Sequence, residues 1–165
     1  MTSSRMLFGL VFLACAGLMA VGLYLQHVER LEPCPLCIMQ RYAFVLTGVI
    51  GLVAALHGPR RVGQAVYGGL IVLAAGTGAG IAGRQVWLQH NPPVALDCGP
   101  DLGYMLDSFP LTQVLPKIFK GEGDCAAVTW RLLGLSIAEW ALIWFAAFIA
   151  AGIFLAVARR NRLQD

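Results

Sequence analysis

Long apolar runs alternate with short polar segments along the chain, and the runs have the length of membrane-crossing helices. Uncharged stretches cover Met6–Leu25, Tyr42–Leu56, Val62–Gly83 and Trp140–Ala158. An α-helix needs about 20 apolar residues to cross the hydrocarbon core of a bilayer. Three stretches are long enough, and the second becomes so if its helix begins near Cys37. The pattern therefore predicts four spans, at approximately 6–25, 39–56, 62–83 and 138–158.

The composition supports an all-α membrane protein, built as one four-helix bundle without a separate soluble domain. The 165 residues have a mean hydropathy of +0.71 and only 13% of them are charged, which is too apolar for a soluble domain. The first apolar run exceeds the roughly 7 to 15 residues of a signal-peptide core, so we expect it to remain as a helix. We also expect four glycines of the third span to let neighbouring helices approach closely: Gly69, Gly76, Gly80 and Gly83.

The distribution of charge predicts how the bundle is oriented. Arg5, the HGPRR segment at 57–61 and the ARRNR segment at 158–162 are short and basic, whereas most acidic residues lie in the other two connections. Short basic segments stay in the cytoplasm, so we expect both termini and segment 57–61 there. The other connections, approximately 26–38 and 84–137, then form two outer loops. The net charge of +3 is small and scattered, which argues against nucleic-acid binding.

The second outer loop has a helical pattern of its own. Between Leu102 and Ile118, apolar residues recur at spacings of three and four. Short amphipathic helices on the membrane surface would produce this pattern, and a small packed loop is the alternative.

Four of the five cysteines lie in the outer loops, where disulfides persist: Cys34, Cys37, Cys98 and Cys125. A zinc site is disfavoured because the second pair forms no C-x-x-C, and we expect no metal. Inert structural disulfides would suit the second pair. A disulfide between Cys34 and Cys37 closes almost no loop and therefore stabilises the fold little, so this pair is better suited to electron exchange. Cys15, alone in the first span, is expected to be a small buried hydrophobe.

The first pair stands in the stretch EPCPLCIMQR, residues 32–41. Pro35 predicts that Cys37 lies in the first turn of the second span, where exposed backbone N–H groups and the helix dipole favour a thiolate. Arg41 follows four residues later, on the same helix face and inside the outer edge of the membrane. Its cation can stabilise the thiolate or an anionic partner lying against it, and snorkelling to the interface is the alternative.

Two cysteine pairs on one side of a membrane bundle suggest an electron relay. Electrons would enter at Cys98 and Cys125 and leave through Cys34 and Cys37. The sequence contains no C-x-x-C-H haem motif and no nucleotide-binding motif. A lipid-soluble quinone next to Arg41 is the acceptor that remains.

At these residues the sequence closely resembles the DsbB family of bacterial disulfide-generating membrane proteins. The similarity covers essentially the whole chain and includes PCPLCIMQR, GRQVWLQ, DCGP, GDC and LGLSIAEW. The resemblance implies an inner-membrane oxidoreductase whose redox cysteines face the periplasm. It would reoxidise a DsbA-like periplasmic thiol oxidase and pass the electrons to ubiquinone or menaquinone.

The resemblance also implies a role for each cysteine. Cys98 matches the cysteine that forms the mixed disulfide with the DsbA-like carrier, and Cys125 matches its partner. Cys34 matches the residue that exchanges with Cys125 between the loops. Cys37 matches the thiolate that contacts the quinone ring.

Two further residues are expected at the quinone. Arg41 matches the quinone-site arginine of the family. Many members carry a histidine where this chain has Gln85, and a glutamine can donate a hydrogen bond to a quinone oxygen without carrying a proton near neutral pH. Two rival interpretations are a protein like vitamin K epoxide reductase, which shares the four-helix and C-x-x-C plan, and a non-catalytic membrane scaffold with structural disulfides.

Overall fold

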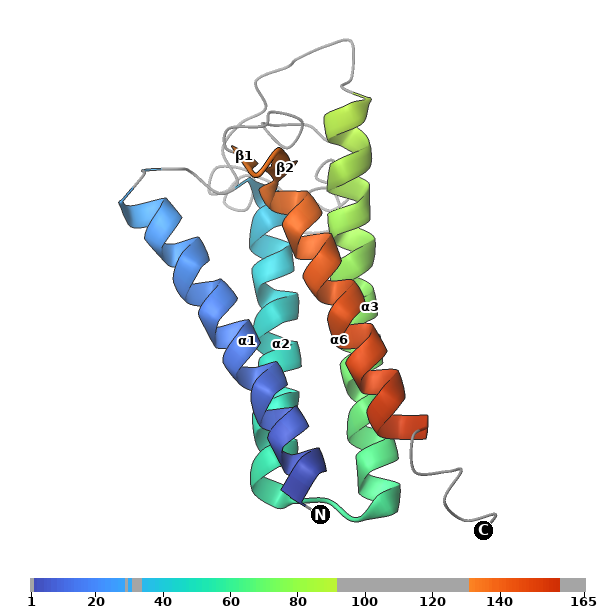
Figure 1. Cartoon of the computed structure of the whole chain (residues 1–165). Coiled ribbons are helices and arrows are strands. Elements are labelled where there is room, and N and C mark those ends of the chain that lie inside the picture. Colours follow the sequence, from blue (N-terminus) through green and yellow to red (C-terminus); the bar gives the residue numbers. More distant parts are fainter. Residues whose placement is uncertain (1, 29, 31–33, 92–130, 158–165) are drawn as a thin grey trace, which may run out of the picture.

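Four long helices form the bundle that the sequence predicts. The computed structural model describes residues 2–28, 30, 34–91 and 131–157. Within these residues, four helices are long and apolar enough to cross a membrane, which confirms the all-α membrane fold. The helices are α1 (Thr2–His27), α2 (Pro35–His57), α3 (Arg61–His90) and α6 (Ile137–Val157). The N-terminus, the α2–α3 connection and the end of α6 lie together at one end of the bundle (Figure 1).

Helices α2 and α3 are several residues longer than the predicted spans at the end of the bundle that holds Cys37. Helix α2 begins at Pro35, so Cys37 lies within its first turn. Helix α3 continues past residue 83 to His90, which places Gln85 on a helix. The amphipathic helices expected between Leu102 and Ile118 lie outside the described residues, as do Cys98 and Cys125.

Both ends of α2 are fixed by local sequence. Cys34 is the N-cap, with an extended backbone, and its side chain accepts a hydrogen bond from the backbone N–H of Cys37. Pro35 occupies the first helical position, where a missing N–H costs nothing. At the other end Gly58 has φ +59, a left-handed conformation, and its N–H bonds the carbonyl of Ala54. The cysteine pair is therefore built into the start of the helix.

The helices pack in the order α1, α2, α3, α6. Helix α1 packs mainly against α2, and α3 packs against both α2 and α6. The rings of Phe44 on α2 and Phe145 on α6 stack at the centre, with centroids 4.1 Å apart. At the end that holds the N-terminus, Arg5 donates hydrogen bonds to the last carbonyls of α2, on Ala55 and Leu56. At the opposite end of the bundle, helix α1 leans away from the other helices (Figure 1).

The close approach of α3 and α6 depends on glycines other than those expected from the sequence. A Cβ added at Gly68 would lie 2.7 Å from the carbonyl oxygen of Gly152, and one added at Gly78 would collide with the ring of Phe145. The prediction for Gly69, Gly76, Gly80 and Gly83 is wrong, because a Cβ at any of these four meets nothing within 4 Å in the part of the chain that the structure describes. The helix–helix contact runs along a neighbouring face of α3.

A short hairpin leads into α6. Strands β1 (Arg131–Leu132) and β2 (Leu135–Ser136) pair antiparallel, and the turn residues Leu133 and Gly134 both have positive φ, as a tight type I′ hairpin turn requires. Ser136 and Glu139 then form a capping box: Ser136 Oγ accepts from the N–H of Glu139, and Glu139 Oε2 accepts from the N–H of Ser136. Ser136 Oγ also donates to Gln89 Oε1, which connects the start of α6 to the end of α3.

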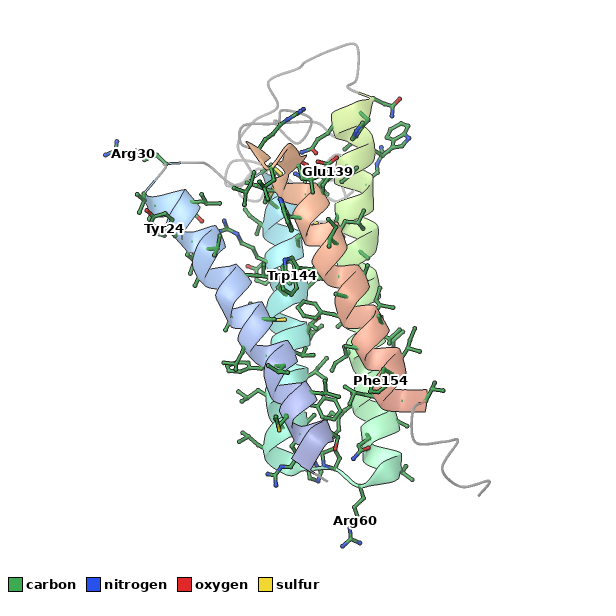
Figure 2. All side chains as sticks on the ribbon, in the orientation of Figure 1. Tyr24, Arg30, Arg60, Glu139, Trp144 and Phe154 are labelled. Atoms are coloured by element: carbon green, nitrogen blue, oxygen red, sulfur yellow. The ribbon has the colours of Figure 1, made fainter. Side chains whose placement is uncertain are left out.

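The outer faces of the bundle are apolar, and charge gathers at its ends. Each helix exposes large apolar side chains, such as Leu13, Leu46, Leu73 and Phe154. In a bilayer these side chains face lipid, so their exposure carries no penalty. Figure 2 shows Arg30 and Glu139 at one end of the bundle and Arg60 at the other.

Candidate redox site

The sulfurs of Cys34 and Cys37 lie together at the start of α2. Their Sγ atoms are 2.8 Å apart, and both side chains are half-buried. The N–H of Cys37 donates to Cys34 Sγ over 3.3 Å. A disulfide needs an S–S distance of about 2.05 Å, so a small movement within one helical turn would join the two sulfurs. The arrangement suits a pair that opens and closes reversibly.

An amide from α3 lies against both sulfurs. Gln85 Nε2 donates to Cys34 Sγ over 3.3 Å and to Cys37 Sγ over 3.2 Å. Gln40, one turn after Cys37, donates from its Nε2 to Gln85 Oε1 over 2.6 Å. Hydrogen bonds donated to sulfur favour negative charge on it, especially where water is excluded. The site therefore includes two glutamines in addition to the two thiols.

The Arg41 side chain is directed toward α1. Its guanidinium donates to Gln26 Oε1 and to the carbonyl of Gly22, the latter over 3.1 Å. Gly22 leaves room for the guanidinium, since a Cβ there would lie 3.8 Å from its nearest atoms. These bonds use only part of the five N–H donors of arginine. Arg41 thus connects α1 to α2 one turn beyond the cysteine pair.

Of the six site residues expected from the sequence, the structure describes four and brings three of them into contact. Cys34, Cys37 and Gln85 are in contact, and Arg41 lies four residues along the same helix as Cys37. Cys98 and Cys125 lie outside the described residues. Sequence reasoning missed Gln40 and Gln26, although each is a polar side chain at the outer end of an apolar helix, and such residues mark candidate functional positions. Cys15 is buried at 2% exposure, as expected of a small hydrophobe.

Taken together, a four-helix membrane bundle and a C-x-x-C pair at a helix start define a membrane-embedded thiol protein. Comparison with known proteins gives the family. Residues 4–155 match the family model of the disulfide bond formation protein DsbB. The chain is 57% identical over 158 residues to a protein named disulfide bond formation protein B from Azoarcus sp., covering 96% of this chain and 95% of the relative.

Further relatives carry the same name. One from Marinobacter nauticus is 51% identical and covers 99% of both chains, and one from Aromatoleum aromaticum is 52% identical over 96% of this chain and 95% of the relative. The chain belongs to the DsbB family of disulfide bond formation proteins. It is thus a multi-pass membrane protein and a disulfide-forming oxidoreductase.

Proposed function

We propose that the protein is a protein-dithiol:quinone oxidoreductase that reoxidises a DsbA-like periplasmic carrier. Two electrons pass from the carrier to Cys98 and Cys125, then to Cys34 and Cys37, and finally to a membrane quinone. The observation that carries this proposal is the pair of half-buried sulfurs 2.8 Å apart, with an amide donor directed at both. Membership of a disulfide-forming family supports it.

Two thiol–disulfide exchange steps move two electrons from one cysteine pair to the other. The thiolate of Cys125 attacks Cys34 of the oxidised pair, a Cys125–Cys34 bond forms, and Cys37 leaves as a thiolate. The thiolate of Cys98 then attacks Cys125, and Cys34 leaves. The outer-loop pair ends as a disulfide, two electrons reside on Cys34 and Cys37, and the attacking thiols have released two protons.

The residues beside Cys37 suit a quinone as the final acceptor. A quinone takes up two electrons and two protons and becomes a quinol. Arg41 offers a cation with several N–H donors one turn from Cys37, at the end of apolar helices that lipid surrounds. Arg41 would bind a ring oxygen, and Cys37 would supply the electrons. Ubiquinone and menaquinone both present such oxygens.

We also propose that the cysteine end of the bundle faces the periplasm of the bacterial inner membrane. Arg5 and Arg60 lie at the opposite end, together with the start of α1 and the end of α6 (Figures 1 and 2). The positive-inside rule then assigns that end to the cytoplasm. The cysteine pair faces the compartment in which disulfides persist.

Turnover of the purified protein tests the proposed function. With a reduced DsbA-like carrier and either ubiquinone or menaquinone, we expect repeated cycles in which one quinol appears for each carrier disulfide. Quinone absorbance and alkylation of carrier thiols measure the two products. A scaffold with structural disulfides would oxidise at most one equivalent of carrier and would reduce no quinone, and that result would contradict the proposal.

Replacing Arg41 tests its proposed contact with the quinone. Arg41→Met removes the cation and all of its donors, so we expect the KM for quinone to rise roughly tenfold, the loss of about 1.4 kcal/mol of binding. Arg41→Lys keeps the charge but loses the planar fork and should have a smaller effect. Steady-state kinetics with varied quinone measures both.

Gln26→Met is the matched control, because it removes the side-chain bond between α1 and Arg41 but leaves the cation in place. We expect this variant to keep a KM close to that of the unmodified protein. If Gln26→Met raises the KM as much as Arg41→Met does, Arg41 acts by fastening α1 to α2 and does not bind the quinone.

A further inference from the structure

Two buried glutamines form a chain from the core of the bundle to the sulfurs. Gln40 on α2 and Gln85 on α3 are each only 4% exposed. Buried amides require hydrogen-bond partners, and here each supplies a partner to the other: Gln40 Nε2 donates to Gln85 Oε1 over 2.6 Å. The short bond joins α2 and α3 directly beneath the cysteine pair.

In the structure, the oxygen of the Gln85 amide faces Gln40 and its nitrogen faces the sulfurs. A side-chain amide has an oxygen that only accepts and a nitrogen that only donates, and the two have nearly the same shape. Because Gln40 donates to Oε1, the two N–H groups of Nε2 are directed to Cys34 Sγ and Cys37 Sγ, at 3.3 and 3.2 Å. As a thiol, Cys37 also donates to Gln85 Oε1 over 3.7 Å, and a Cys37 thiolate has no proton for this bond.

We propose that Gln40 is a positioning residue that holds Gln85 as a fixed donor to the Cys34–Cys37 pair, and that this donor makes the pair a stronger oxidant. The inference deepens the proposed function, on which it rests. It gives Gln85 a role in the thiol chemistry that differs from the quinone contact expected from the sequence.

The donor acts on the reduced form of the pair. When the Cys34–Cys37 bond breaks, Cys37 leaves as a thiolate, and a thiolate accepts a hydrogen bond more strongly than a disulfide sulfur does. A disulfide whose reduced form is stabilised is the stronger oxidant. Because an amide does not titrate, Gln85 remains a neutral donor across the pH range in which a histidine would change its charge.

The thiol–disulfide equilibrium of the pair tests the inference without any quinone. We would use the full-length protein with Cys98→Ala and Cys125→Ala, so that only Cys34 and Cys37 exchange, and count alkylated thiols in redox buffers of known potential. We expect Gln85→Met to favour the disulfide about tenfold, which corresponds to a potential about 30 mV more negative for two electrons. Gln40→Met should produce a similar shift, although Gln40 touches neither sulfur in the structure.

A double-mutant cycle separates positioning from a general loosening of the bundle. If Gln40 acts through Gln85, adding Gln40→Met to Gln85→Met should cause no further shift. Gln64→Met is the matched control, because Gln64 is also buried on α3 and donates to Ser4 Oγ and the Pro59 carbonyl at the other end. It should leave the equilibrium unchanged. Gln40→Leu repeats the test if circular dichroism shows that Gln40→Met does not fold.

Three results would overturn the inference: an unchanged equilibrium in folded Gln40→Met or Gln40→Leu, fully additive shifts in the double variant, or an equal shift in Gln64→Met. Each of them is independent of the proposed function, whose failure would appear as absent quinone reduction in the unmodified protein.

Discussion

Cys37→Ser should abolish quinone-dependent oxidation of the carrier. A hydroxyl in place of the thiol cannot form a disulfide with Cys34, so the pair can no longer accept two electrons. Loss of a covalently reacting group typically lowers the rate by a thousandfold or more, on the order of what is seen when a catalytic nucleophile is removed. Steady-state reduction of quinone in the presence of reduced carrier measures the loss.

Cys15→Ala is the matched control for this prediction. Cys15 is also a free cysteine, but it is buried in α1 and packs against Gly48, away from the pair. Its replacement should leave turnover within about twofold, because a small apolar side chain replaces another. If Cys37→Ser keeps substantial turnover, or if Cys15→Ala abolishes it, the electrons follow a path other than the one proposed.

Gly78→Leu should severely destabilise the bundle. The Cβ of any residue at position 78 would collide with the ring of Phe145, which is fully buried and stacked on Phe44. Because the ring is fully buried and stacked on Phe44, either this stack is disrupted or α3 and α6 separate. Overpacking of this kind costs about 3 kcal/mol. Unfolding of the detergent-solubilised protein by a denaturing detergent, followed by circular dichroism, measures the loss.

Gly76→Leu offers a control with the same change on the same helix. Among the described residues, nothing lies within 4 Å of a Cβ at Gly76, so the new side chain should extend toward lipid. We expect its stability to stay within about 0.5 kcal/mol of the unmodified protein. Equal destabilisation by both substitutions would mean that the loss comes from leucine in this part of α3 in general, and the stacked Phe145 would not be the cause.

Local features of the chain were enough to predict the fold class and the cysteine pair. The length of an uncharged run decides whether a helix can cross a bilayer, and this property requires no knowledge of the other helices. The spacing of Cys34 and Cys37, with Pro35 between them, likewise determines that both thiols lie at the start of one helix. Residues this near in sequence share an environment in whatever bundle forms.

The tertiary partners of these residues could not be predicted from the sequence. Arg41 lies one helical turn after Cys37, which the spacing in the sequence already implies, but its bonds to Gln26 and Gly22 depend on how α1 lies against α2. The partner of Gln40 was not predictable, because it becomes visible only when α3 brings an amide oxygen to this side chain.

The sequence by itself determined which four segments form long apolar helices, that Cys34 and Cys37 lie together at the start of one of them, and that a cation follows on the same helix. Tertiary structure alone decided the rotation of each helix about its axis. That rotation places Gly78, and not Gly76, against Phe145, and it brings Gln85 to sulfurs 48 and 51 residues away. The physical reason is that apolar side chains surround most of each helix, as the exposed and buried positions of α3 illustrate. When nearly every face is apolar, hydrophobic periodicity does not reveal which face meets a neighbour, and close packing between helices makes that choice.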